Sequence, residues 1–215
     1  MRKILVGLMI FTILLTVACE EPTDEEIFYK MQKKLSKMES YSTIANITVV
    51  GNKSEKTYKL RHIFKRPNRY IIQVIEPEES GGCITVYDGK QAWIYHPQIN
   101  QSMLIKDFKG SAEQNIFIGY FLKLFVTNED IRISAENIKD AQYLTLTADI
   151  PGNNKYRYKE KLWVDKETFT PYQLIIYDKD GKASVKVKYS NFKHNVDIKD
   201  EEFNIEATKK ILNNI

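Results

Sequence analysis

The chain is poor in the residues that build metal and redox sites. It contains only two cysteines and three histidines among its 215 residues. No histidine has a second histidine or cysteine at metal-ligand spacing, and neither the HExxH nor the CxxC pattern occurs. Phosphate loops, dinucleotide fingerprints and the Gly-x-Ser-x-Gly motif are missing as well. The sequence therefore predicts no metal, no cofactor and no catalytic residue.

A large excess of charge of either sign is also missing. The 32 basic residues nearly balance the 28 acidic ones, which leaves a formal net charge of +4. Nucleic-acid-binding proteins carry a clear basic excess on one face, so this balance argues against a nucleic-acid partner. No linker or shift in composition divides the chain. Length and composition thus predict one domain, with a core large enough to fold without disulfide bonds.

What the sequence does have is an N-terminal export signal. Arg2 and Lys3 precede an uncharged apolar run over residues 4–15, and Cys19 follows directly after a small residue. The pattern resembles the lipobox of bacterial lipoproteins, in which the cysteine is diacylated and becomes the mature N-terminus. Thr16 departs from it, because a large aliphatic residue is usual three places before the cysteine. A membrane-spanning helix and a plain secreted protein are the alternatives, although the run is shorter than the ~20 residues of a span.

If Cys19 carries lipid, the chain divides into three parts. We expect a signal peptide over residues 1–18, a lipidated tether over residues 19–22 and one folded domain over residues 23–215. The domain would then sit on the extracytoplasmic face of the cell membrane. Cys83 would be the last cysteine of the domain, so no intramolecular disulfide is available. Its apolar neighbours predict a small buried side chain and not a reactive thiol.

A first helix is predicted directly after the tether. It begins with a capping box, in which Thr23 is the N-cap and Glu26 stands three residues on, and it runs to about Ser40. Its apolar residues recur at three- and four-residue spacing and share one face: Ile27, Met31, Leu35 and Met38. This narrow stripe favours packing on the domain, and a basic helix lying on the membrane surface is the alternative.

A second helix is predicted in the middle of the chain, over residues 111–126. Ser111 is its expected N-cap, and Glu113 lies in its first turn. Because the helix is strongly apolar, it has to be covered by the sheet. Five of its side chains are candidates for a lid, or for the wall of a cavity beneath it: Phe117, Tyr120, Phe121, Leu124 and Phe125.

Outside the helices the apolar period changes to two, which is typical of strands. Eleven segments show it: residues 41–50, 56–64, 70–76, 83–87, 92–95, 101–105, 130–134, 143–150, 156–164, 172–177 and 183–191. Turn residues separate them, and Asp88-Gly89 predicts a type I′ hairpin. Short connections of this kind join antiparallel strands. The sequence therefore predicts an α+β fold that is mostly β, with one antiparallel sheet of about eleven strands.

Several of these segments carry a family pattern. A basic-Pro-Asn-Arg-aromatic order over residues 65–70 starts one strand, and the hairpin over residues 86–97 follows. Leu162-Trp163-Val164-Asp165 and the tail over residues 198–203 continue the pattern. Together they resemble the lipoprotein carrier superfamily of LolA, LolB and RseB-like proteins. That resemblance implies a strongly curved, unclosed barrel with a helix inside as a lid. The hairpin residues fit a structural role in it: Asp88, Gly89, Trp93, Tyr95 and Pro97.

Within this superfamily, the lipid-anchored, helix-first layout resembles the GerS germination lipoproteins of spore-forming clostridia. The resemblance implies a protein that is not an enzyme and that binds and regulates a cell-wall amidase, or another envelope protein, during modification of spore-cortex peptidoglycan. It places the protein at the cell membrane or the forespore envelope. The alternative is a carrier or sensor that holds lipid or lipoprotein acyl chains in the concave face. An unrecognised hydrolase is a third hypothesis.

Two features separate the docking protein from the carrier. If the mid-chain helix fills the concave face, little volume remains for lipid, whereas a cavity of several hundred Å³ beneath it would favour carriage. Acylation of Cys19 works against a shuttle, because burial of each CH₂ contributes about 0.8 kcal/mol to membrane binding and two chains anchor stably. The sequence thus favours an anchored docking protein.

Overall fold

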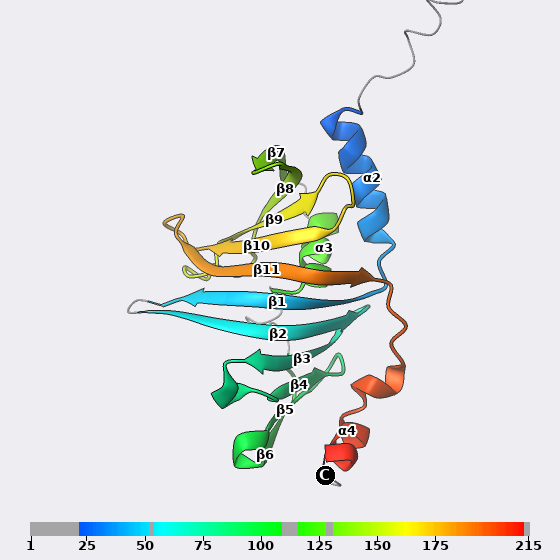
Figure 1. Ribbon diagram of the computed structural model, residues 1–215, viewed down its shortest axis with the longest axis vertical. Helices are drawn as coiled ribbons and strands as arrows, with labels where there is room; N and C mark the ends of the chain where they lie inside the picture. The colour runs from blue at the N-terminus through cyan, green and yellow to red at the C-terminus, as the bar shows by residue number, and fades with distance from the viewer. Residues whose placement is uncertain (1–21, 52–53, 109–115, 128–130, 213–215) are drawn as a thin grey trace, which may run out of the picture.

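The computed structural model describes residues 22–51, 54–108, 116–127 and 131–212. In these ranges the chain forms one sheet of eleven antiparallel strands (Figure 1). The strands are β1 (Ser40–Val50), β2 (Glu55–Lys65), β3 (Arg69–Glu76), β4 (Ile84–Tyr87), β5 (Ala92–His96), β6 (Gln101–Ile105), β7 (Arg132–Ile138), β8 (Ala141–Asp149), β9 (Lys159–Asp165), β10 (Pro171–Tyr177) and β11 (Ala183–His194). The helices are α2 (Asp24–Ser36), α3 (Ile118–Thr127) and α4 (Ile205–Leu212).

The sheet is open, because the strands at its two edges, β6 and β7, do not pair with each other. The strand order runs β6-β5-β4-β3-β2-β1-β11-β10-β9-β8-β7, so the first and last strands meet at the centre and two mid-chain strands form the edges. The central ladder extends from Val49 opposite Val185 to Tyr41 opposite His194. The predicted fold class, an unclosed antiparallel sheet of about eleven strands, is confirmed.

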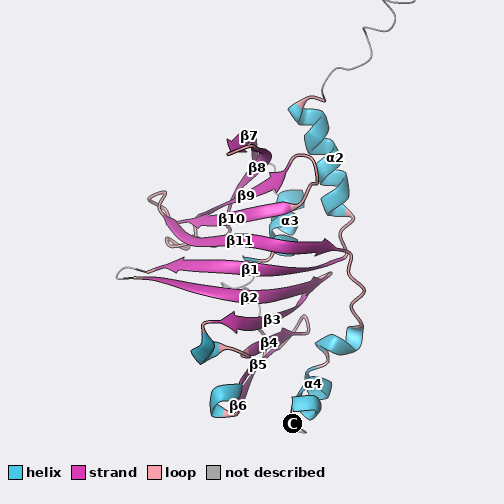
Figure 2. Cartoon of the chain, viewed as in Figure 1, coloured by secondary structure: helices cyan, strands magenta, loops and turns pink. Residues whose placement is uncertain are grey.

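The mid-chain helix occupies the crossover between the two edges. The chain leaves the sheet after β6 and re-enters it at β7, on the opposite edge, and α3 belongs to this connection. Figure 2 shows α3 behind the central strands, on the concave side of the sheet. The connection therefore brings its apolar helix onto the face that the sheet has to bury.

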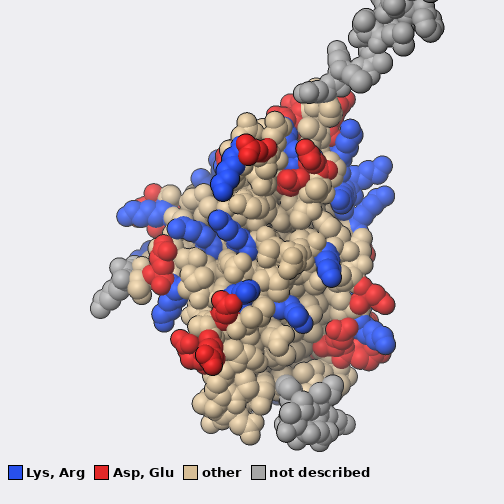
Figure 3. Space-filling model, in the orientation of Figure 1, with Lys and Arg blue, Asp and Glu red and all other residues tan. Residues whose placement is uncertain are grey.

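Alternation along the strands divides the sheet into a dry and a wet face. In β11, Val185, Val187 and Tyr189 are buried, while Lys186 and Lys188 between them are exposed. Since successive side chains of a strand point to opposite faces, the buried set faces the concave side and the lysines face solvent. Figure 3 shows charged side chains of both signs scattered over the outer face in view.

Helix α2 forms where the capping box predicts it but ends earlier than expected. The Thr23 hydroxyl accepts a hydrogen bond from the Glu26 N–H at 3.3 Å. Met31 and Leu35 are buried. The helix ends at Ser36 and not near Ser40, because Ser40 already starts β1.

Several strand boundaries of the second half also differ from prediction, and β7 and β11 end later than expected, at Ile138 and His194. β8 starts at Ala141, two residues early, because Ile138 pairs with Ala141 across a tight turn in which Lys139 adopts a φ of +55°. A lysine gives no signal for such a turn. β9 starts at Lys159, three residues late, and Tyr156 is exposed in the preceding loop.

Several expectations fall outside the described ranges. These are the signal peptide over residues 1–18, the acceptor Cys19, and the helix cap Ser111 with Glu113. Within the described part of the chain, no helix is long and apolar enough to cross a membrane.

Candidate functional site

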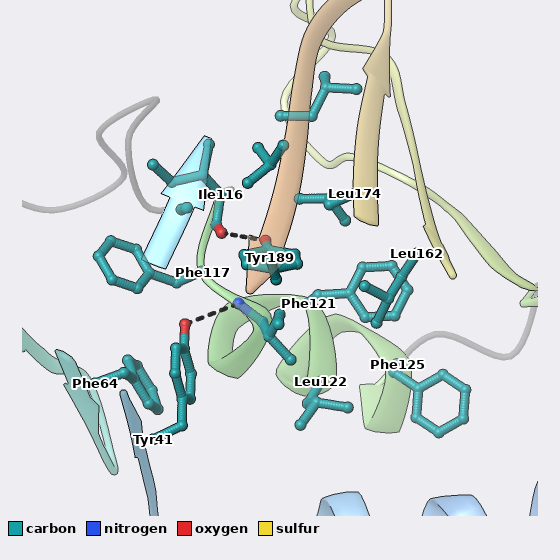
Figure 4. Close-up of a cluster of buried hydrophobic side chains, with 14 of the residues drawn as sticks. Tyr41, Phe64, Ile116, Phe117, Phe121, Leu122, Phe125, Leu162, Leu174 and Tyr189 are labelled. Carbon is teal, nitrogen blue, oxygen red and sulfur yellow. Dashed lines mark hydrogen bonds between the residues drawn. The ribbon is translucent and has the colours of Figure 1, made fainter. Parts of the chain in front are cut away.

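Helix α3 fills the concave side of the sheet. α3 begins at Ile118, so Phe117, which was predicted inside the helix, directly precedes it. At most 1% of Phe117, Ile118 and Phe121 is exposed, and Leu122 and Phe125 are buried as well. These side chains join one continuous core with residues from both halves of the sheet, as Figure 4 shows. The face that would receive a lipid is therefore occupied by the protein's own helix.

Two buried tyrosines fix the start of α3 to the central strands. The Ile118 N–H donates a hydrogen bond to the Tyr41 hydroxyl oxygen at 3.2 Å, and the Tyr189 hydroxyl donates to the Ile116 carbonyl at 2.8 Å (Figure 4). Burial raises the pKa of Tyr41 and of Tyr189 well above the usual range. Both hydroxyls thus stay protonated and form hydrogen bonds with backbone groups at the start of α3 and just before it.

A glycine lets α3 approach β2 closely. A Cβ added at Gly119 would overlap the ring of Phe64, which is itself buried. Phe64 stacks on Tyr41 at a centroid distance of 5.4 Å and lies edge-on to Tyr120 at 6.0 Å. The helix is consequently seated on an aromatic layer that leaves no room for a side chain at Gly119.

Removal of one tyrosine hydroxyl tests this attachment. We expect Tyr41→Phe to lower the free energy of unfolding by about 1–2 kcal/mol, because the Ile118 N–H would stay buried without its acceptor. Tyr95→Phe is the matched control, since the Tyr95 hydroxyl bonds an exposed partner, Asn100. Urea denaturation followed by circular dichroism measures both. Equal stability of the two variants would show that the hydrogen bond to α3 contributes nothing.

The structure places the predicted lid residues at two depths. Phe117, Phe121 and Phe125 are buried. Tyr120 is half-buried and its hydroxyl donates to the Asn68 carbonyl oxygen at 3.4 Å. Leu124, the fifth, has a side chain outside the described part of the structure.

The hairpin between β4 and β5 is held by its aspartate. Asp88 Oδ1 accepts the N–H groups of Lys90 at 2.8 Å and Gln91 at 2.9 Å. A type I′ turn centred on Asp88-Gly89 needs positive φ at both residues, but here Gly89 has a φ of +104° and Asp88 has no positive φ. The type I′ prediction is therefore wrong, because the Asp88 side chain organises the turn instead.

Trp93 and Tyr95 lie on the outer side of the sheet. Their rings stack at 5.7 Å, and Trp93 belongs to a small second core with Val86 and Ile205 of α4. Pro97 follows β5 directly and opens a short 3₁₀ turn. These hairpin residues pack and shape the strands.

Helix α4 and the segment before it were missed by sequence reasoning. Asp200 receives Lys65 Nζ at 2.7 Å and Arg69 at 3.0 Å, and these hydrogen bonds lower its pKa. The Arg69 guanidinium also lies over the Phe203 ring at 5.1 Å. The C-terminal segment is thereby fastened to β2 and β3, and Ile205 covers Trp93. The signal was the acidic run over residues 200–202, which lies between the apolar residues Ile198, Phe203 and Ile205.

Two buried ionisable side chains were missed as well. Glu160 is 1% exposed and His62 is fully buried, and neither has a hydrogen-bond partner among the described residues. Burial raises the pKa of Glu160 to about 8 and lowers that of His62 to about 3. Both groups are consequently neutral at pH 7. The His62 ring stacks on Phe117 at 4.8 Å, so it belongs to the layer that seats α3.

Three surface hollows formed by described residues lie elsewhere. About 670 Å³ opens between α2 and the β9–β10 turn, with Ile27, Lys30 and Lys166 in its wall. Two smaller hollows, of about 300 and 330 Å³, lie beside Tyr172 and Asp200. None of the three is lined by a residue of α3. Among the described residues, no three His, Cys, Asp or Glu side chains gather as metal ligands would.

Cys83 is half-buried rather than fully buried. Its thiol lies 3.8 Å from Gln98 Oε1, and burial raises its pKa.

The open antiparallel half-barrel with a helix across its concave face defines the LolA-like class of fold. The chain matches the YdcC-like sporulation proteins over residues 1–203, and it belongs to that family. It is 22% identical to sporulation protein YdcC of Bacillus subtilis over 201 residues, which are 93% of this chain and 58% of that protein. The chain spans about half the length of the curated relatives it matches.

Solved structures include two informative relatives. The chain is 31% identical to a chain of the CwlD amidase complex with the GerS lipoprotein from Clostridioides difficile, with 81% of this chain and 98% of that chain covered and a TM-score of 0.49. It is 18% identical to the LolA superfamily protein NE2245 from Nitrosomonas europaea. The match covers 85% of this chain and 97% of that chain, with a TM-score of 0.45. The predicted resemblance to LolA-like proteins, and to GerS among them, is confirmed.

Proposed function

We propose that this protein is a membrane-anchored, non-enzymatic lipoprotein that binds and regulates a cell-envelope enzyme. The enzyme is a peptidoglycan amidase that acts in spore-cortex modification and germination. Membership of a sporulation protein family supports the process. The similarity to GerS, which was solved in complex with the CwlD amidase, supports the kind of partner.

The burial of α3 against the concave face is the observation that favours docking over lipid transfer. A carrier has to offer its concave face to an acyl chain, but here Phe117 and Phe121 fill that face and two tyrosines bond the helix start. Lipid could enter only after these contacts broke. Docking on the outside of the domain requires no such change.

A fixed anchor at Cys19 is part of the same proposal. A doubly acylated N-terminus holds a protein stably at the membrane. The apolar run and the cysteine of the first 19 residues support this anchor. The proposed location is the extracytoplasmic face of the cell membrane, and during sporulation the forespore envelope.

Stimulation of the amidase tests the proposal. We expect the purified CwlD-type amidase of the same organism to release stem peptides from peptidoglycan about tenfold faster when this protein is added, equivalent to ~1.4 kcal/mol of coupling. Cys19→Ala should stimulate equally in solution but lose its partition into membranes. Recovery of bound lipid together with an unchanged amidase rate would instead favour the carrier.

A further inference from the structure

The two open edges of the sheet differ in how they are protected. Edge strands expose unpaired N–H and C=O groups, and proteins usually block them with charged side chains, proline or bulges. The edge strand β7 carries Arg132 and Glu136. Arg132 pairs with Asp149 at 3.5 Å, and Glu136 accepts hydrogen bonds from Lys161 and from Trp163 Nε1. This edge is therefore blocked by charge.

The edge strand β6 has none of these protections. Its five residues, Gln-Ser-Met-Leu-Ile, include no charge and no proline, and the first four are exposed. Met103 is 56% exposed and Leu104 38%, and Ile99 in the turn before the strand is 59% exposed. Figure 3 shows no Lys, Arg, Asp or Glu on the visible side of the lower end, where Figure 1 places β6.

The exposed apolar side chains of β6 point to opposite faces of the sheet. Met103 pairs with Ile94, and Leu104 pairs with Trp93. Neighbouring residues of a strand alternate between faces, so Leu104 shares the outer face with Trp93 and Met103 the inner face with Ile94. A flat membrane or a single helix could cover one of the two. An added strand covers both, because its own side chains alternate in the same way.

The lack of charge in β6 indicates that a strand added beside it should be uncharged as well. An ionised side chain placed opposite β6 would lose water without meeting an opposite charge, which is unfavourable. Anionic polymers such as nucleic acid or teichoic acid find no lysine or arginine within β6, and only Lys106 is exposed directly after it. Two other apolar surfaces among the described residues are occupied, since α3 fills the concave face and α4 covers Trp93.

We propose that β6 is the docking edge, and that an uncharged, extended segment of the envelope enzyme pairs with it as a twelfth strand. This inference rests on the proposed function and names the surface that carries it out. Backbone hydrogen bonds along Gln101–Ile105 hold the segment, and apolar side chains of the enzyme pack on Met103 and Leu104.

Substitutions at the two edges test the assignment. The full-length protein in non-ionic detergent is titrated with the CwlD-type amidase of the same organism. Met103→Lys combined with Leu104→Lys should weaken binding about tenfold or more, as loss of a central apolar contact does. Ile133→Lys is the matched control, because Ile133 is 42% exposed on the other edge strand, and its affinity should stay within twofold of wild type.

Hydrogen exchange gives a second reading without any substitution. Amide protons of residues 101–105 should exchange more slowly in the complex, while those of residues 132–138 should be unchanged. Wild-type protein that fails to bind the amidase would overturn the proposed function and its docking edge together. Binding that leaves β6 unprotected and resists the double substitution would overturn only the docking edge. Protection of β6 in a dimer of this chain, without the enzyme, would also overturn the docking edge.

Discussion

Raising the pH from 6.5 to 8 should destabilise the protein by up to about 1.4 kcal/mol per pH unit through one residue, Glu160. Burial raises the pKa of its carboxyl to about 8, whereas an unfolded chain ionises it near pH 4.3. Below pH 4 the carboxyl is protonated in both states and has no effect on the equilibrium. Between these values only the unfolded chain releases the proton, so rising pH favours unfolding until the folded carboxyl ionises as well.

Glu160→Gln removes this dependence. The amide has the same shape but cannot ionise, so the variant should be more stable than the wild type by about 4 kcal/mol at pH 7. Its stability should not change between pH 6.5 and 8. Guanidinium unfolding at several pH values measures the two slopes. Glu79→Gln is the control, because Glu79 is exposed and its substitution should leave the wild-type slope intact. Parallel slopes for wild type and Glu160→Gln would contradict the assignment.

His62 has the opposite effect at lower pH. Its pKa is lowered to about 3 by burial, so the unfolded chain gains a proton below pH 6.5 that the folded chain does not accept until pH 3. Between pH 6.5 and about 4.5 the effects of His62 and Glu160 oppose each other. Below that interval His62 dominates, and stability should fall as the pH falls.

Gly119→Ala should destabilise the protein by about 2–3 kcal/mol and loosen α3, since overpacking a filled core costs about this much. The new methyl group would overlap the Phe64 ring. That ring cannot swing aside, because Tyr41, Phe117 and Tyr120 surround it at centroid distances of 5.4 to 6.1 Å. Helix propensity alone would act in the other direction, as alanine is favoured over glycine inside a helix.

A second substitution separates this overlap from other causes. Phe64→Leu shortens the side chain that meets the methyl group, so the double variant should lose less stability than the sum of the two single variants. Thermal unfolding provides the four values of the cycle. Binding of a fluorescent fatty acid by Gly119→Ala, but not by wild type, would show that the concave face becomes open to lipid once α3 is displaced. Additive losses would contradict the close contact.

Much of the fold follows from local periodicity. The alternation of Val185, Val187 and Tyr189 sets both the strand and its buried face, and the meander follows from short connections. Pairing of β1 with β11 could not be read from the sequence, because it joins segments more than 130 residues apart through backbone hydrogen bonds that carry no side-chain code. The turn at Lys139 was missed because lysine gives no signal for the positive φ that it adopts there.

The candidate site was predictable in part. The apolar face of α3 indicated a covered helix, but the attachments from Tyr41 and Tyr189 depend on tertiary placement. The burial of Glu160 and His62 could have been predicted from the sequence. Glu160 shares its strand parity with Leu162 and Val164, and His62 shares it with buried Phe64. The alternation of buried and exposed positions along each strand would by itself have predicted that both ionisable side chains are buried.

The central position of the β1–β11 ladder has a consequence for how the chain assembles. Each half of the sheet is a local meander that can form as soon as its own strands are available, whereas the joint between the halves needs the first and the last strand together. Contacts of such high sequence separation form slowly, because the loop between them must close first. Until β11 is complete, β1 is itself an unpaired edge, and an exported chain would depend on its final strand to bury it.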